Sequence, residues 1–149
     1  MRNLKTRLLI ASPVLLSSAL LIATAPARAQ DKTIATRDGS CQATVPASWI
    51  IDSFPGSANS PDKKVSLIIS SPRYNSLATL KENASKLYPD DKVTKDSASE
   101  FEMEGKSMNG KPNVYRGIPA GAKLCIGEVV YESGTVQDAR KILGTLKAK

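Results

Sequence analysis

The two cysteines, Cys41 and Cys125, constrain this chain more than any other feature. They lie 84 residues apart in short runs that alternate like β-strands, "CQATV" and "LCIGE". Neither has the CxxC spacing, basic neighbour or helix N-terminus that lowers the pKa of a reactive thiol. An even number of cysteines in an exported chain favours pairing. We therefore expect a disulfide that ties an early strand to a late one and contributes about 4 kcal/mol in the chain-entropy model.

Residues 1–29 predict that the chain is exported. Basic residues precede the apolar run "LLIASPVLLSSALLIA", and "APARAQ" then offers the small residues that a signal peptidase reads. We expect cleavage between Ala29 and Gln30, which leaves a mature chain of residues 30–149. An uncleaved anchor is disfavoured, because the run is shorter than the ~20 apolar residues that span a bilayer and contains Pro13. The predicted location is the bacterial periplasm or the exterior, with membrane contact only through the leader.

Composition excludes several classes of function. Four basic residues leave with the leader, which lowers the formal net charge from +7 to +3. Interspersed charges and few aromatic residues disfavour nucleic-acid binding. The chain has no histidine, so Ser-His-acid and Cys-His hydrolysis and imidazole zinc sites are excluded. We predict no cofactor and no metal site, and we expect about 120 residues to form one domain.

The segment "EFEMEG" holds the conspicuous acids of the chain. Glu100, Glu102 and Glu104 alternate with Phe101 and Met103, so the acids share one face of a strand. One reading is a cation site or an acid/base pair. The favoured reading is a solvated face of an amphipathic strand beside lysines.

The other strands follow from alternation and turn residues. We expect strands at 41–45, 49–51 and 64–71, with the first and last as neighbours and the Pro, Gly and Ser stretch 54–62 as a long loop between them. Asn109 and Gly110 predict a type I′ hairpin between the acidic strand and a strand at Val114 and Tyr115. A central strand is expected at 123–133.

Two helices are predicted from helical spacing. The first spans 76–88, with Leu77, Leu80, Ala84 and Leu87 on one side. The second begins at Thr135 and Asp138, which have capping-box spacing, and carries a stripe from Val136 to Leu146 that ends the chain. The predicted class is α+β, with an antiparallel sheet packed on two helices in a single domain with one disulfide.

At the level of pattern, the chain resembles the PsbP/Mog1-like domains over residues 41–147. The resemblance is carried by "VPASW", an amphipathic helix, an acidic strand running into "NGKP", the strand "VVYES" and the closing "ARKILGTL". It implies a non-enzymatic binding or assembly factor and supplies no catalytic residue to carry over.

The predicted function is an exported, non-catalytic binding or accessory protein with an unidentified protein or ligand partner in the envelope. The alternative is a periplasmic enzyme inhibitor or immunity-type protein; an enzyme that uses lysines and carboxylates is disfavoured. The expected contact surface is formed by loops 54–62 and 116–123. The candidate contact residues are Trp49, Tyr74, Tyr115 and Arg116. A tryptophan after an apolar strand is more often a core residue than an anchor.

Overall fold

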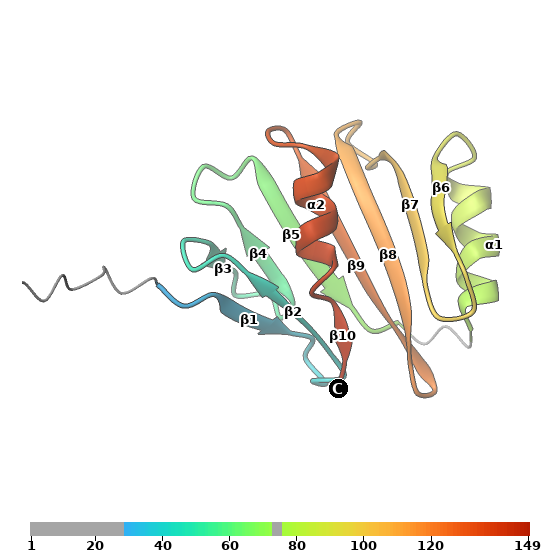
Figure 1. Ribbon diagram of the computed structural model, residues 1–149, viewed down its shortest axis with the longest axis horizontal. Helices are drawn as coiled ribbons and strands as arrows, with labels where there is room; N and C mark the ends of the chain where they lie inside the picture. The colour runs from blue at the N-terminus through green and yellow to red at the C-terminus, as the bar shows by residue number, and fades with distance from the viewer. Residues whose placement is uncertain (1–28, 73–75) are drawn as a thin grey trace, which may run out of the picture.

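The computed structural model describes residues 29–72 and 76–149. Residues 1–28 of the predicted signal peptide and the candidate Tyr74 therefore lie outside the described residues. Ala29 and Gln30, at the predicted cleavage point, are exposed and precede the first strand. The described chain folds into two antiparallel sheets and two helices, which confirms the α+β class (Figure 1).

The large sheet has seven strands in the order β3-β4-β5-β9-β8-β7-β6. They are β3 (Ile50–Ile51), β4 (Ser57–Asn59), β5 (Val65–Ser70), β6 (Lys92–Asp96), β7 (Phe101–Lys106), β8 (Pro112–Ala120) and β9 (Lys123–Tyr131). The central hairpin β8–β9 has nine residues in each strand.

The small sheet has the order β1-β2-β10. Its strands are β1 (Lys32–Ala35), β2 (Cys41–Val45) and β10 (Lys147–Ala148). Together with helix α2 (Val136–Leu143), it covers one face of the large sheet (Figure 1). Helix α1 (Leu77–Leu87) lies on the opposite face of the large sheet. Alternate residues of β9 point to the two faces of that sheet. Cys125 therefore packs in the core under α2, whereas Leu124 and Ile126 pack against α1.

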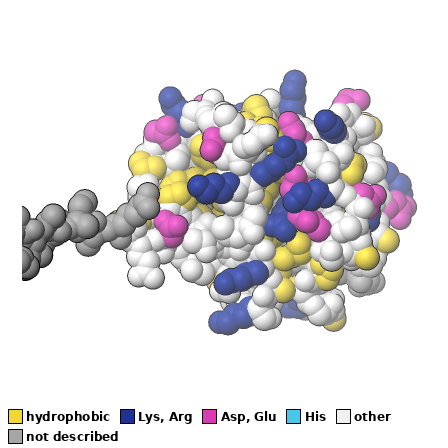
Figure 2. Space-filling model, viewed as in Figure 1, with side chains coloured by type: hydrophobic (Ala, Val, Ile, Leu, Met, Phe, Trp, Pro, Cys, Tyr) yellow, Lys and Arg dark blue, Asp and Glu magenta, His cyan; other side chains and the backbone are white. Residues whose placement is uncertain are grey.

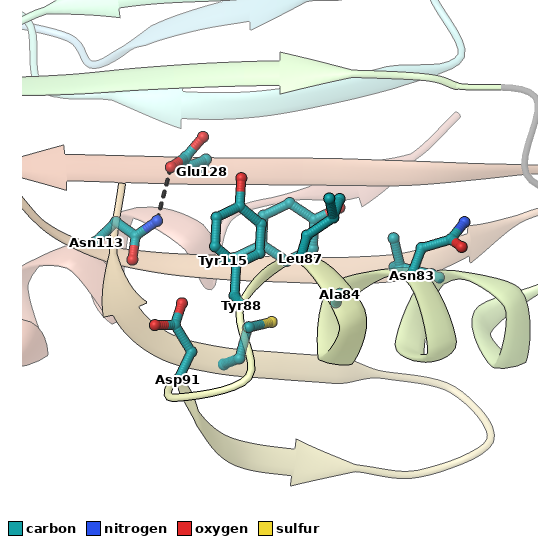
Figure 3. A pocket seen from close by; sticks show the side chains of 10 residues that line it. Asn83, Ala84, Leu87, Tyr88, Asp91, Asn113, Tyr115 and Glu128 are labelled. Carbon is teal, nitrogen blue, oxygen red and sulfur yellow. Dashed lines mark hydrogen bonds between the residues drawn. The ribbon is translucent and has the colours of Figure 1, made fainter. Parts of the chain in front are cut away.

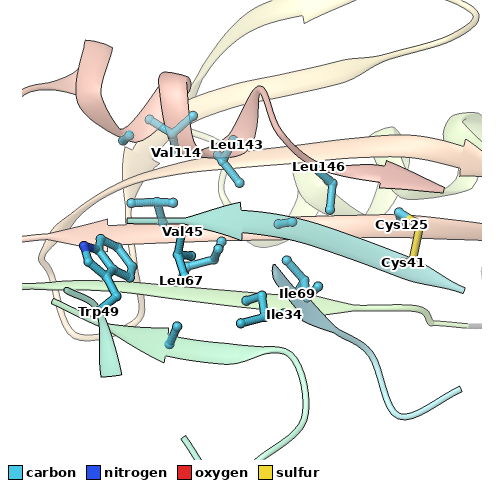
Figure 4. Close-up of a cluster of buried hydrophobic side chains, with 14 residues drawn as sticks. Ile34, Cys41, Val45, Trp49, Leu67, Ile69, Val114, Cys125, Leu143 and Leu146 are labelled. Carbon is cyan, nitrogen blue, oxygen red and sulfur yellow. A yellow bond between two sulfur atoms is a disulfide. The ribbon is translucent and has the colours of Figure 1, made fainter. Parts of the chain in front are cut away.

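The larger core lies between the two sheets (Figure 4). Val45 from β2, Leu67 from β5 and Leu143 from α2 are among its fully buried side chains. The predicted disulfide is present: Cys41 on β2 is bonded to Cys125 on β9, with a Cα–Cα distance of 5.5 Å. It ties the small sheet to the centre of the large one.

Two predicted strand arrangements are wrong. Strand β2 and strand β5 are not neighbours in one sheet; they face each other across the core, and β5 pairs with β4 and β9. The stretch 54–62 is also not one long loop, because its centre forms β4, in which Ser57 and Ala58 are buried. A three-residue strand of small residues fits closely against β5 but lacks the apolar alternation by which strands are recognised.

The first helix forms where its spacing predicts. The side chain of Ser76 accepts a hydrogen bond from the Thr79 N–H as the N-cap. Of the predicted apolar side, Leu77, Leu80 and Ala84 are buried, but Leu87 is 70% exposed. It lies in the last turn of α1, beside a cavity rather than against the sheet.

The second helix begins at the predicted capping box of Thr135 and Asp138. It ends at Leu143 rather than continuing to the end of the chain, because Gly144 caps it and the chain turns. Leu146 is still buried, but through the turn that leads into β10, which pairs with β2. The chain therefore ends on a short strand and not on a helix.

The predicted hairpin between β7 and β8 is present, with a different turn. Lys106 pairs with Pro112, and the Gly110 N–H donates to the Ser107 carbonyl. A type I′ turn needs two residues at positive φ, but in this turn only Gly110, at φ 75°, has one. Within 29–72 and 76–149, neither helix is long and apolar enough to cross a membrane.

Candidate functional site

The acidic face that runs from Glu100 into β7 is mostly covered, so the prediction of a solvated face is wrong. Glu102 is 1% exposed, because α2 packs over this face and places Arg140 against it. The Arg140 Nε lies 2.9 Å from one Glu102 oxygen, and the Thr94 hydroxyl donates to the same oxygen at 2.8 Å. Lys95 lies 3.4 Å from the second oxygen. Burial alone raises the pKa of Glu102, but the hydrogen bonds from Thr94 and Arg140 outweigh it, so the net pKa is lowered.

The neighbouring acids are paired as well. Arg140 Nη2 lies 2.9 Å from Glu104, and Glu100 is held by Lys95 at 2.9 Å and by Arg116 at 2.6 Å. Figure 2 shows basic and acidic side chains interspersed over the face that carries α2. Every carboxylate of this network has a cation, so it fastens α2 to the sheet and offers no unpaired acid or base for chemistry.

The sequence-predicted contact residues lie in three different places. Trp49 is 6% exposed and packs in the core between the sheets. Arg116 is half-buried; it pairs with Glu100 and also donates to the Leu143 carbonyl at the end of α2. The structure thus places both inside the framework and does not bring them together. Tyr115 points to the opposite face of the large sheet, where it lines a cavity beside α1.

This cavity, which we call the α1 pocket, has a volume of 180 Å³ and lies between α1 and strands β7, β8 and β9 of the large sheet (Figure 3). Its lining residues come from α1, the following turn and strands β7, β8 and β9: Leu80, Asn83, Ala84, Leu87, Tyr88, Asp91, Met103, Asn113, Tyr115 and Glu128. Leucine, alanine and methionine side chains form its apolar part, and two tyrosine rings lie beside its polar groups. Such a mixture is typical of a small-ligand or side-chain site.

Strand register brings the polar groups of the pocket together. Glu128 pairs with Tyr115, and Asn113 pairs with Gly105 one step along the same face. The Asn113 amide donates to Glu128 at 2.7 Å. Asp91 follows α1 and lies directly over Gly105, where an added Cβ would fall 1.9 Å from its carboxylate. Only glycine at position 105 allows Asp91 to lie this close to the sheet.

Sequence reasoning missed Asp91, Asn113 and Glu128. One signal was available: Glu128 is an acid inside "LCIGEVVY", an otherwise apolar central strand. Asp91 and Asn113 carried no comparable signal, because a turn aspartate and a strand-edge asparagine are common.

The predicted contact loops are largely strands. Segment 116–123 is the end of the β8–β9 hairpin, and only residues 121 and 122 lie between the two strands. Segment 54–62 contains β4. The described part of the chain holds no group of three or more Asp, Glu, Cys or His side chains arranged for a metal ion.

No family model matches the chain, and no curated protein matches it. Among solved structures, it is similar to cyanobacterial PsbP (CyanoP) from Synechocystis sp. PCC 6803, with 11% identity, a TM-score of 0.49, and coverage of 81% of this chain and 94% of that one. It is also similar to a protein of Bacteroides thetaiotaomicron, with 18% identity and a TM-score of 0.46 over 80% of this chain and 49% of that one. The resemblance predicted from the sequence names the same group as the first of these structures.

Proposed function

We propose that the chain is an exported, non-catalytic binding or accessory protein that contacts its partner or ligand through the α1 pocket. The observation that carries this proposal is the convergence of Asp91, Asn113 and Glu128 with two tyrosine rings in one cavity. Export is supported by the leader pattern of residues 1–29 and by the Cys41–Cys125 disulfide, which persists in an oxidising compartment.

The α1 pocket is favoured over the cavity beside the N-terminus of α2. That cavity is larger, at 490 Å³, but two of its polar side chains already have a structural role. Thr135 and Asp138 bond to each other as the capping box of α2. In the α1 pocket, by contrast, no Lys or Arg is among the lining residues, and the carboxylates accept hydrogen bonds from uncharged groups: Glu128 from the Asn113 amide and Asp91 from the Lys106 backbone N–H. Carboxylates without a cationic partner are the ones that a charged ligand can use.

A binding role fits the chemistry better than catalysis. The chain has no histidine. Both cysteines are in the disulfide, so neither is a nucleophile. The buried carboxylate Glu102 lies in the α2 network, where ion pairs with Arg140 and Lys95 hold it charged.

The test is to block the pocket from its helical side. Asn83 lines the pocket on α1, and Asn83→Trp would fill it without replacing a core residue. Glu82→Trp, at an exposed neighbouring position outside the lining, is the matched control. We expect a partner captured from a periplasmic extract to be retained by the wild type and Glu82→Trp and lost with Asn83→Trp, at equal melting temperature. A partner retained equally by all three proteins would contradict the assignment.

A further inference from the structure

The polar groups on the sheet side of the α1 pocket include two carboxylates and an amide. Asp91 and Glu128 present carboxylate oxygens, which only accept when ionised. One N–H of the Asn113 amide donates to Glu128 at 2.7 Å. Its carbonyl oxygen takes no part in this hydrogen bond.

Asn113 brings an amide oxygen to the same side of the pocket. It is only 6% exposed, and buried amides normally use both of their polar atoms. Figure 3 shows its oxygen turned away from Glu128, toward the side on which Asp91 lies. The acceptor therefore lies between the two carboxylates, where one donor-rich group can reach it.

The net charge of the lining is negative, which also favours a ligand with N–H donors. Asp91 and Glu128 give it a formal charge of −2, and no Lys or Arg is among the lining residues. Elsewhere in the described chain, acids such as Glu82 and Glu132 have lysine partners. The uncompensated negative charge of the pocket favours a cationic ligand.

The remaining lining suits an organic cation better than a metal ion. Tyr88 and Tyr115 provide ring faces that attract ammonium and guanidinium groups. No metal-binding group of three or more side chains is present in the described residues. The volume of 180 Å³ equals the share of about six water molecules, which is room for one such group on a short alkyl chain.

We propose that the α1 pocket binds an organic cation, an ammonium or guanidinium group on a short alkyl chain. This inference rests on the proposed function of the pocket and names its ligand chemistry. The source of the cation is either a lysine or arginine side chain of a partner protein or a free amine. In both cases the N–H groups donate to Asp91, Glu128 and the Asn113 oxygen, and the alkyl chain lies against Leu87 and the tyrosine rings.

The experiment uses protein expressed with its own residues 1–29 and purified in its processed form. Agmatine, which carries a guanidinium and an ammonium group, is titrated while backbone and tyrosine NMR signals are followed; butyramide is the neutral probe. We expect saturable shifts near α1, β8 and β9 with agmatine and none with butyramide. Glu128→Gln and Asp91→Asn should each raise the agmatine Kd about fivefold, as loss of one partly exposed ion pair would. Asp90→Asn, an exposed neighbour that removes the same charge outside the α1 pocket, should leave the Kd unchanged.

The outcomes separate this inference from the proposed function. Butyramide binding as tightly as agmatine, or a Kd unaffected by both pocket variants, overturns the cation proposal. If Asn83→Trp nevertheless abolishes binding of a partner protein, the proposed function stands without the cation proposal. A small amine retained by the native protein in mass spectrometry supports the free source, and elution of a protein partner by agmatine supports the side-chain source.

Discussion

Glu102→Gln tests whether the buried network under α2 stabilises the fold as a set of ion pairs. The substitution keeps the size of the side chain and can keep the hydrogen bond from Thr94, while it removes the charge that faces Arg140 and Lys95. A hydrogen bond to a charged group contributes ~1.5–3 kcal/mol. Arg140 remains paired with Glu104, so it is not left as an isolated charge. We expect the free energy of unfolding to fall by about 2 kcal/mol at pH 7.

The pH dependence of this difference is the sharper part of the prediction. The pKa of Glu102 is lowered below its ordinary value of 4.5 in the folded state. A lowered carboxyl pKa contributes stability that is present above the unfolded pKa and is lost as the pH falls through the folded pKa. The difference between the wild type and Glu102→Gln should therefore be full at pH 6–7 and shrink steadily below pH 4.5.

Urea unfolding followed by tryptophan fluorescence is the assay. Trp49 is the only tryptophan of the chain and is buried, so its emission reports the opening of the core. Glu82→Gln is the control, because its pair with Lys86 is solvent-exposed and contributes only ~0.3 kcal/mol. Equal stabilities of Glu102→Gln and wild type at pH 7, or a difference that persists unchanged at pH 3, would refute the reasoning.

Three further predictions concern the disulfide, the packing of α1 and processing. Reducing Cys41–Cys125 should lower the stability by about 4 kcal/mol and make both thiols reactive to maleimide, which thermal melting and mass analysis would show; thiols already labelled in the oxidised protein would contradict it. Gly117→Ala should cost ~1 kcal/mol in the same melts, because the new Cβ would lie 2.4 Å from the Leu80 Cδ2 and force that side chain to move; an unchanged melting temperature would show that α1 adapts freely. N-terminal sequencing of the exported protein should begin at Gln30, and a full-length, membrane-held product would exclude the cleavage.

The features that the sequence predicted correctly depend on local or pairwise signals. The capping residues Ser76 and Thr135 act within one turn of their helices, so the helix starts follow from a few neighbouring residues. The disulfide follows from two cysteines with a single way to pair. Where a helix stops is less local: α2 ends because the chain after Gly144 is taken up by pairing with β2, which begins about a hundred residues earlier.

The missed strands lack a local signal. Strand β6, with the sequence "KVTKD", is a polar edge strand whose side chains are mostly exposed, and β4 consists of small residues. Both form because a neighbouring strand supplies the hydrogen bonds, and that neighbour is not visible in the strand's own composition.

Glu102 illustrates a different limit. The period of two correctly placed the three acids on one face of β7, but it does not say what covers that face. The cover comes from Arg140, 38 residues later, once α2 has folded back over the sheet. A buried acid and a solvated acid therefore have the same local pattern, and only the later basic residue distinguishes them.

The α1 pocket depends on register in the same way. Asp91, Asn113 and Glu128 come from a turn and two strands, and they meet because Asn113 lies opposite Gly105 on one side and Val130 on the other. A shift of one residue in either pairing would turn Glu128 or Asn113 to the α2 face. The glycine at 105 and the acid within "LCIGEVVY" are then joint requirements of one site: the first admits the Asp91 carboxylate to the sheet surface, and the second places another carboxylate two strands away. Their presence together is the reason to propose this cavity, and not the ion pairs under α2, as the ligand site.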